Sequence, residues 1–102
     1  MERKEFIKNE IKQEPENPFN YYLLALELKK EGDVDSSIET FNLLVVNFPN
    51  YIATYYSFAD YLLELGKDDK AKEILDTGIE RAEASGSTKA LHELKQLLEL
   101  NF

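Results

Sequence analysis

An internal repeat with a period of 34 residues is the feature that most constrains the fold. Shifting the chain by this period places residues 18–49 over residues 52–83, and seven of the 32 pairs are identical. About two identities are expected by chance at ordinary residue usage. The identical pairs are Tyr21 with Tyr55, Tyr22 with Tyr56, Ala25 with Ala59, Leu28 with Leu62, Gly32 with Gly66, Asp35 with Asp69 and Glu39 with Glu73. A period of this length predicts two copies of one supersecondary unit, each of which needs its neighbour to bury a continuous core.

The first unit reads as two helices separated by a glycine. Asn17 is a predicted N-cap before Pro18, because proline lacks only an N–H that is unsatisfied at the first helical position. Gly32 is expected to end this helix in the left-handed conformation, and Asp33 to cap the next one. Apolar residues recur at helical spacing in both helices: Tyr21, Leu24, Ala25 and Leu28 in the first, then Ile38, Phe41, Val45 and Phe48 in the second.

The second unit repeats this pattern after Pro49. Asn50 is the expected cap of its first helix, Gly66 the stop, and Asp68 the cap of its second helix, which ends near Gly86. The apolar stripes here are Tyr55, Phe58, Ala59 and Leu62, then Ala71, Ile74, Leu75 and Ile79.

Two further helices are predicted at the ends of the chain. Residues 2–13 are highly charged, with Phe6, Ile7 and Ile11 as their apolar side chains. Ser87 or Thr88 is the expected cap of a last amphipathic helix, whose stripe is Ala90, Leu91, Leu94, Leu97 and Leu98. We therefore expect a single all-α domain over residues 1–102 with about six helices: a flanking helix at 2–13, repeats at 17–49 and 50–86, and a capping helix at 87–100.

The two units resemble the tetratricopeptide repeat. The first unit carries its pattern as Tyr21, Leu24, Ala25, Leu28, Gly32, Ser37, Phe41 and Pro49, and the second as Tyr55, Phe58, Ala59, Leu62, Gly66, Ala71, Leu75 and Gly78. Two positions depart from it: Leu44 stands where a small residue is expected, which should loosen one helix contact, and Glu83 replaces a closing proline. The resemblance implies antiparallel helix-turn-helix repeats stacked as a short right-handed superhelix. It also implies a protein-interaction module that binds a partner peptide or helix on the concave face, and not an enzyme.

In this family the first helix of each repeat lines the concave surface. The corresponding stripe, beside the apolar one, contains Phe19, Tyr22, Leu26, Lys29 and Lys30 in the first unit and Ala53, Tyr56, Asp60, Leu63 and Glu64 in the second. Of these, we predict that the partner binds Phe19, Tyr22, Leu26, Lys29, Lys30, Tyr56, Asp60 and Leu63. Tyr22 and Tyr56 occupy equivalent places and are expected to lie side by side. The family members that grip a terminal carboxylate use Lys, Asn and Arg on this stripe, so such a clamp is absent here.

Two other uses of the same surfaces stay open. A flanking helix that folds over the stripe would make Tyr22 and Leu26 ordinary core residues. Alternatively, the chain is a self-associating structural protein, a homodimer formed through Leu97, Leu100 and Phe102.

Charge and composition disfavour several classes of function. The net charge of -8, with basic residues scattered among acidic ones, lacks the basic stripe that nucleic acids or anionic membranes require. No apolar run is long enough for a membrane span and no secretory signal is visible, so a cytoplasmic location is expected.

No pattern of metal-binding, cofactor-binding or catalytic residues is recognisable. The sequence contains no cysteine, and His92 is its only histidine. Asp33, Asp35 and Ser37 begin like a calcium loop, but Ile38 and Leu44 stand where that loop needs glycine and glutamate. We expect no cofactor and no metal.

Overall fold

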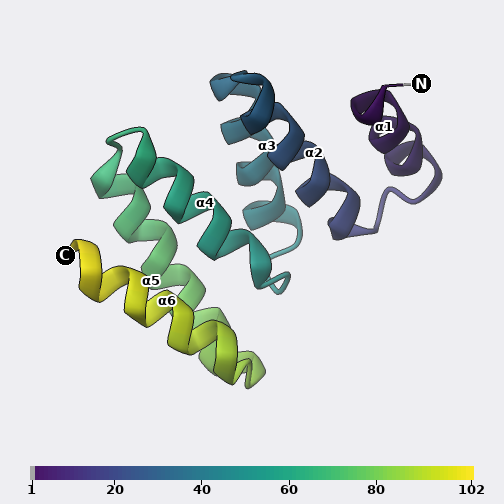
Figure 1. Ribbon diagram of the computed structural model, residues 1–102. Coiled ribbons are helices and arrows are strands. Elements are labelled where there is room, and N and C mark those ends of the chain that lie inside the picture. The colour runs from purple at the N-terminus through teal and green to yellow at the C-terminus, as the bar shows by residue number, and fades with distance from the viewer. Residues whose placement is uncertain (1) are drawn as a thin grey trace. The chain divides into compact units, whose positions relative to one another are not determined.

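The computed structural model describes residues 2–102, which form six helices and no strand (Figure 1). The helices are α1 (Arg3–Gln13), α2 (Pro18–Glu31), α3 (Val34–Asn47), α4 (Ala53–Glu64), α5 (Asp68–Ser85) and α6 (Thr88–Asn101). The chain has the predicted all-α helical repeat fold. It divides into two compact units, of which the first ends at Phe48 and the second begins at Pro49. That residues 1–102 form one domain stays a prediction.

Helices α2 and α3 of the first unit begin and end at the residues that the sequence predicts. The Asn17 side chain accepts a hydrogen bond of 3.1 Å from the Phe19 amide, and the Asp33 carboxylate accepts one of 3.3 Å from the Ser36 amide. Gly32 ends α2 with φ of 80°, a conformation that a residue with a Cβ resists. Because both helices are capped beside the same short turn, they pack as an antiparallel pair.

The contact between α2 and α3 depends on two small residues. Ala25 and Ser37 are both fully buried, and the Ser37 hydroxyl donates a 2.9 Å hydrogen bond to the Ala25 carbonyl oxygen. On α3 the buried positions are Ser37, Phe41 and Leu44, whereas Val45 is only half-buried. The buried face therefore includes Leu44 in place of the predicted Val45, following an i, i+4, i+7 pattern. Leu44, which we expected to loosen a helix contact, is fully buried in the core.

Helix α1 packs on α2 through one buried side chain and two ion pairs. Ile7 is buried, whereas Phe6 is exposed although the sequence grouped it with the apolar residues of this helix. Arg3 Nε lies 2.9 Å from Glu27 Oε1, and Lys4 Nζ lies 2.9 Å from Glu31 Oε1. The hydrogen bond to Glu31 raises the pKa of Lys4. Because both ion pairs are partly exposed to solvent, they add only modestly to the contact that Ile7 makes.

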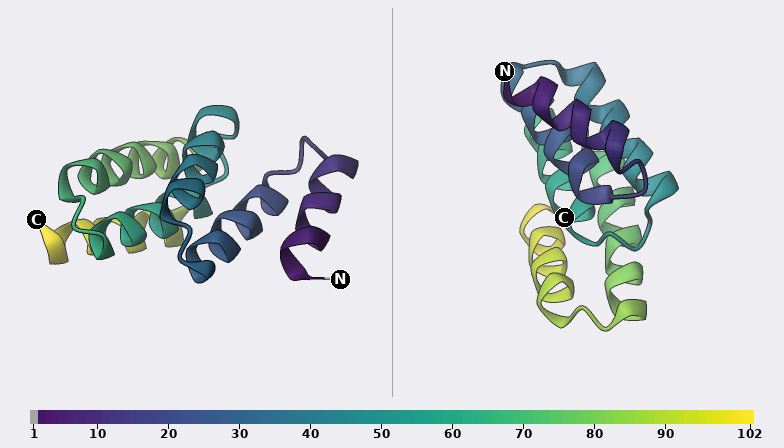
Figure 2. Two further views of the ribbon diagram at one scale, coloured as in Figure 1. Left: turned by 90° about the horizontal axis from the view of Figure 1, so that it is seen from above. Right: turned by 90° about the vertical axis from the view of Figure 1, so that its right-hand side faces the viewer.

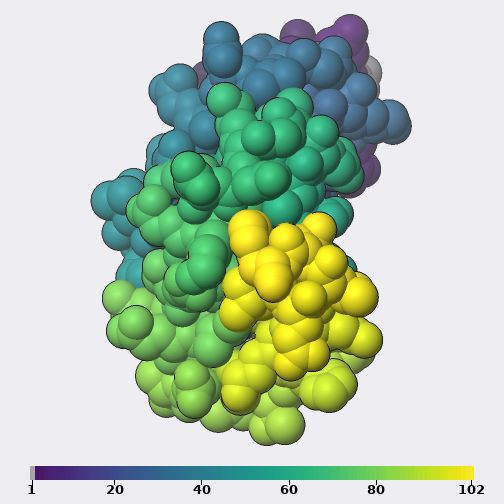
Figure 3. Space-filling model, turned by 90° about the vertical axis from the view of Figure 1, so that its left-hand side faces the viewer, coloured from purple at the N-terminus to yellow at the C-terminus, as the bar shows by residue number. Residues whose placement is uncertain are grey.

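The second unit consists of the antiparallel helices α4 and α5 with α6 packed against both. Figure 2 shows α5 and α6 running in opposite directions on either side of a short turn, and Figure 3 shows α6 lying against α4 and α5. Gly86 makes the turn with φ of 70°. The core contains the predicted α4 residues Tyr55, Phe58, Ala59 and Leu62 together with Ala71, Ile74, Leu75, Gly78, Ala82, Leu94 and Leu97. Leu97, which we considered for a dimer surface, therefore belongs to the core.

A glycine allows α5 to approach α4 closely. A Cβ built on Gly78 would lie 2.5 Å from the Tyr55 Cβ and 2.9 Å from its Cγ, closer than carbon atoms pack. The Tyr55 hydroxyl donates a 2.6 Å hydrogen bond to the Pro49 carbonyl oxygen. Tyr21 makes the equivalent bond of 2.9 Å to Pro15. The repeat thus extends back to Pro15, which the 34-residue register pairs with Pro49.

Three predicted helix caps differ in the structure. Asn50 does not cap α4, whose N-cap is Ile52; its side chain instead accepts a hydrogen bond from Arg81. Asp68 is the first residue of α5, because the repeat register places the N-cap one residue earlier, at Lys67. Its carboxylate still lies in the first helical turn, where the helix dipole favours negative charge. Ser87 does hold the N-cap position of α6, but its side chain does not cap the helix.

Within residues 2–102, no helix combines the length and the apolar character needed to cross a membrane.

Candidate functional site

The first candidate site is a pocket of about 500 Å³ in the second unit, where the first turns of α4 and α6 come together. We call it the α4–α6 pocket, and its lining residues are Ile52, Ala53, Ser87, Thr88, Lys89, Ala90 and Glu93. Apolar side chains from both helices form much of this lining. The pocket exists because Ala53 and Ala90 are too small to fill the space between the two helices.

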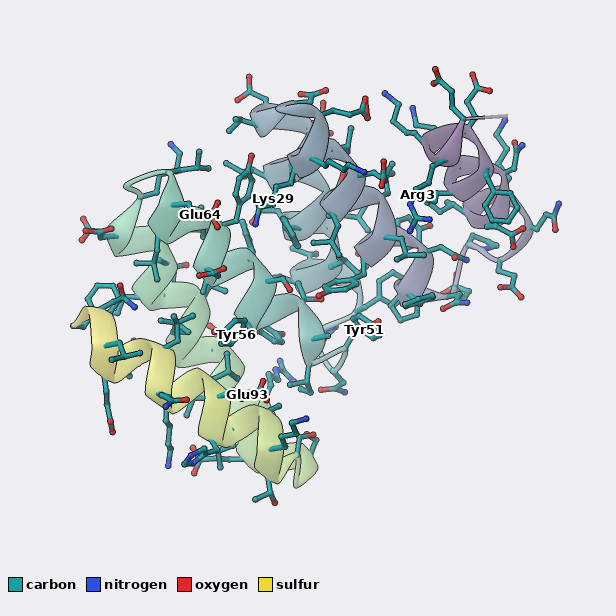
Figure 4. All side chains as sticks on the ribbon, in the orientation of Figure 1. Arg3, Lys29, Tyr51, Tyr56, Glu64 and Glu93 are labelled. Carbon is teal, nitrogen blue, oxygen red and sulfur yellow. The ribbon has the colours of Figure 1, made fainter. Side chains whose placement is uncertain are left out.

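An exposed aromatic residue follows the α4–α6 pocket along α4. Tyr56 is three residues after Ala53 and is 39% exposed. Figure 4 shows Tyr56 on the side of α4 that faces α6, with Glu93 across from it on α6. Neither Lys89 nor Glu93 has an ion-pair partner in the described part of the chain. The lining of the pocket is therefore mainly apolar and includes one charged residue of each sign.

In the first unit, the predicted site residues follow one another along α2. Phe19 is 49% exposed, Lys30 is exposed, and Tyr22, Leu26 and Lys29 are half-buried. This helix face thus presents two aromatic rings, of which one is exposed, together with one half-buried leucine and two lysines.

The predicted residues of the second unit, Asp60 and Leu63, lie on α4 together with Tyr56 and are half-buried. Ala53 of the predicted stripe lines the α4–α6 pocket, whereas the eight residues predicted to bind the partner do not. That Tyr22 lies beside Tyr56 stays a prediction, because these residues belong to different units.

The sequence comparison missed the contribution of α6 to this pocket. The 34-residue period could have indicated it. Continued once more, this period places Ser87, the N-cap of α6, over Ala53, the first residue of α4, so α6 corresponds to the first helix of a further repeat. We interpreted it only as a cap. The N-terminal end of α6, with its N-cap Ser87, supplies Thr88, Lys89, Ala90 and Glu93 to the pocket lining.

Residues 2–102 contain no group of three or more His, Cys, Asp or Glu side chains arranged to hold a metal ion. His92 is exposed on α6. One group with a perturbed acidity lies in the second unit, where burial raises the pKa of Tyr55 and the nearby positive charge of Arg81 partly offsets this rise. Tyr55 is in the core and bonded to Pro49, so we assign it a structural role.

Repeated helical hairpins with open, partly apolar faces define a helical-repeat protein of the kind that binds other proteins. The family model for the tetratricopeptide repeat matches residues 20–45 and 52–85. The chain belongs to this family.

Two solved structures with the same fold also come from this family. One is the crystal structure of a tetratricopeptide repeat domain protein from Salinibacter ruber, 34% identical, with a TM-score of 0.72, covering 78% of this chain and 90% of that one. The other is a solution NMR structure of a tetratricopeptide repeat domain protein from the same organism, also 34% identical, with a TM-score of 0.77, covering 82% of this chain and 85% of that one. No curated protein matches the chain.

Tetratricopeptide repeats generally mediate interactions between proteins and typically serve as non-enzymatic scaffolds. The chain is therefore a protein-interaction module in this general sense.

Proposed function

We propose that the chain binds a partner peptide or helix on the first helix of each repeat, α2 in the first unit and α4 in the second, and on α6, which corresponds to the first helix of a further repeat. On α2 the contact residues are Phe19, Tyr22, Leu26, Lys29 and Lys30. On α4 they are Tyr56, Asp60 and Leu63, and the α4–α6 pocket adjoins them.

The α4–α6 pocket beside an exposed Tyr56 carries this proposal. An open pocket of about 500 Å³ with a mainly apolar lining is suited to receive an apolar side chain of a partner. Tyrosine beside such a pocket buries much area at little entropic cost and has a hydroxyl that can form a hydrogen bond. The charges of Lys89 and Glu93 in the lining would select the register of the partner without adding much affinity.

Exposure on α2 agrees with the same mode of binding. Phe19 is 49% exposed although burial of a phenyl ring is favourable, so a partner that covers this ring gains hydrophobic free energy. Lys30 at the other end of the helix is exposed and would pair with an acidic group of the partner.

Substitution of a pocket residue tests the proposal. A partner captured from the native cell and then purified would be titrated against the wild-type protein and Ala53→Arg. Ala53 is exposed and lines the pocket, so the arginine fills the pocket with little effect on the core. We expect binding to weaken by about tenfold or more, the size of effect seen at interface centres.

The matched control is Val46→Arg, because Val46 lies on α3, is 75% exposed and is outside the proposed face. The control should bind the partner like the wild-type protein. If Ala53→Arg binds normally while Val46→Arg does not, the partner uses the second helices and the proposed face is wrong.

Self-association is a second candidate function, favoured by two exposed apolar side chains at the end of α6. Leu100 is 77% exposed and Phe102 is 49% exposed. Sedimentation of the wild-type protein and Leu100→Lys over a wide concentration range would test this. A wild-type dimer that the substitution dissociates supports self-association, whereas a strict monomer rules it out.

A further inference from the structure

A second hollow lies in the first unit, where α2 begins and α3 ends. Its volume is about 410 Å³, and it is lined by Pro15, Glu16, Tyr21, Leu43, Asn47 and Phe48. We call it the α2–α3 hollow. None of these residues is on the α2 stripe of the proposed function, so the hollow calls for a separate explanation.

Aromatic rings and an acidic side chain surround this hollow. The rings of Tyr21 and Phe48 have centroids 5.6 Å apart and are tilted by 35°. Tyr21 is held in place by its 2.9 Å hydrogen bond to the Pro15 carbonyl oxygen. The side chains of Glu16 and Asn47 are exposed, and neither side chain has a hydrogen-bond or ion-pair partner among residues 2–102. The hollow thus combines fixed ring surfaces with an unpaired carboxylate.

The second repeat shows which group occupies the equivalent place there. By the 34-residue register, Arg81 corresponds to Asn47, Asn50 to Glu16 and Tyr55 to Tyr21. Arg81 Nη1 lies 3.5 Å from Asn50 Oδ1, so its guanidinium spans the gap between the end of α5 and the segment before α4. The charge of Arg81 also acts on Tyr55, whose pKa it lowers against the effect of burial. In the second unit, therefore, an exposed guanidinium of the chain itself lies against the segment before α4.

We propose that the α2–α3 hollow binds the guanidinium of an arginine side chain carried by a partner protein. Asn47 is too short to reach across, which leaves the place open. Glu16 supplies the negative charge that Asn50 lacks in the second unit. A guanidinium stacks on aromatic faces and forms a paired hydrogen bond with a carboxylate, so the residues of the hollow suit arginine better than lysine.

The net charge of the chain favours the same ligand. At -8, the protein attracts basic segments at long range, and the unpaired Glu16 provides a local end point for that attraction. The inference does not depend on the proposed binding faces of α2, α4 and α6, because it concerns other residues.

A titration with a small probe tests this inference. We would add N-acetyl-arginine amide to the labelled wild-type protein and follow the ring resonances of Tyr21, Phe48 and Tyr55 by NMR. The expected result is a saturable shift at Tyr21 and Phe48, with a dissociation constant on the order of millimolar for a single exposed contact of this kind. Tyr55 should not move, because its ring is fully buried. The neutral isostere N-acetyl-citrulline amide should cause no saturable shift.

Three variants distinguish a guanidinium site from nonspecific contact. Glu16→Gln should weaken binding of the arginine probe by about fivefold, the contribution of one exposed charge. Asn47→Arg copies the second repeat and should abolish binding because it fills the hollow. The double variant Arg81→Asn with Asn50→Glu is a negative control: it should cause no shift at Tyr55, because that ring is fully buried.

Three results would overturn the proposal. The first is the absence of any saturable shift in the wild-type protein, and the second is an equal response to the citrulline probe. The third is unchanged binding by both Glu16→Gln and Asn47→Arg. Because Glu16 is exposed and Glu16→Gln leaves the core untouched, this variant remains informative even if Asn47→Arg fails to fold.

Discussion

Replacing Gly78 with alanine is expected to destabilise the second unit, even though alanine favours helices. Alanine in a helix interior is more favourable than glycine by about 1 kcal/mol. Against this, the added methyl group would lie 2.5 Å from the Tyr55 Cβ, 2.9 Å from its Cγ and 3.3 Å from Leu94 Cδ1. Forcing one extra carbon into a packed core typically costs about 1–3 kcal/mol. Because the contact at Gly78 is unusually short, we expect a cost near the upper end of this range.

The steric term should prevail because Tyr55 cannot move aside. Its ring is fully buried, its hydroxyl is bonded to Pro49 at 2.6 Å, and the closest atom is its Cβ, which moves only with the backbone of α4. We therefore expect a net loss of about 1–2 kcal/mol, or a melting temperature lower by roughly 4–16 °C for a protein of this size.

Urea unfolding followed by circular dichroism measures this loss. Glu80→Ala, an exposed substitution two residues further along α5, serves as the control and should change stability by no more than about 0.5 kcal/mol. Tyr55→Ala should not restore the stability of Gly78→Ala, since alanine keeps the Cβ that causes the clash. If Gly78→Ala is as stable as the wild-type protein or more so, the close approach of α5 to α4 is not as described.

Three further predictions concern buried polar groups. Ser37→Ala removes the hydrogen bond to the Ala25 carbonyl and should lower the free energy of unfolding by about 1 kcal/mol in a urea titration; no loss would mean that the bond contributes nothing. The Thr54 hydroxyl is buried and lacks a partner in the described part of the chain, so Thr54→Val should raise that free energy by about 1 kcal/mol, and a decrease would contradict this reading. Since burial raises the pKa of Tyr55 above 10.0, its contribution to stability is complete below pH 10.0 and is lost as the pH rises through the folded-state value. Alkaline unfolding of the wild-type protein should therefore be steeper than that of Tyr55→Phe, and equal slopes would refute the assignment.

The helices were predictable because local chemistry determines where most of them begin and end. Asn17, Gly32 and Asp33 act on their own neighbours, and the structure shows the expected bond or backbone conformation at each. The caps at Asn50 and Asp68 were wrong for a related reason: side-chain type alone does not fix the position of a cap. In α5 the repeat register sets the N-cap at position 67, where the residue is lysine.

The helix face of α3 and the pocket at α6 depend on tertiary packing and could be predicted only in part. Leu44 and Val45 are adjacent and both apolar, so the sequence pattern cannot decide which of them enters the core. The pocket depends on the distance between two helices separated by α5. The shortness of Ala53 and Ala90 indicates a gap only once those helices are known to lie together.

Mapping the contact surface of a purified partner tests the central claim most directly. Chemical-shift changes would be recorded for the backbone and for Tyr22 and Tyr56 in the complex. Changes concentrated on α2, α4 and the first turns of α6 are the predicted result. Changes confined to α3 and α5, with both tyrosines unaffected, would contradict the proposed binding face.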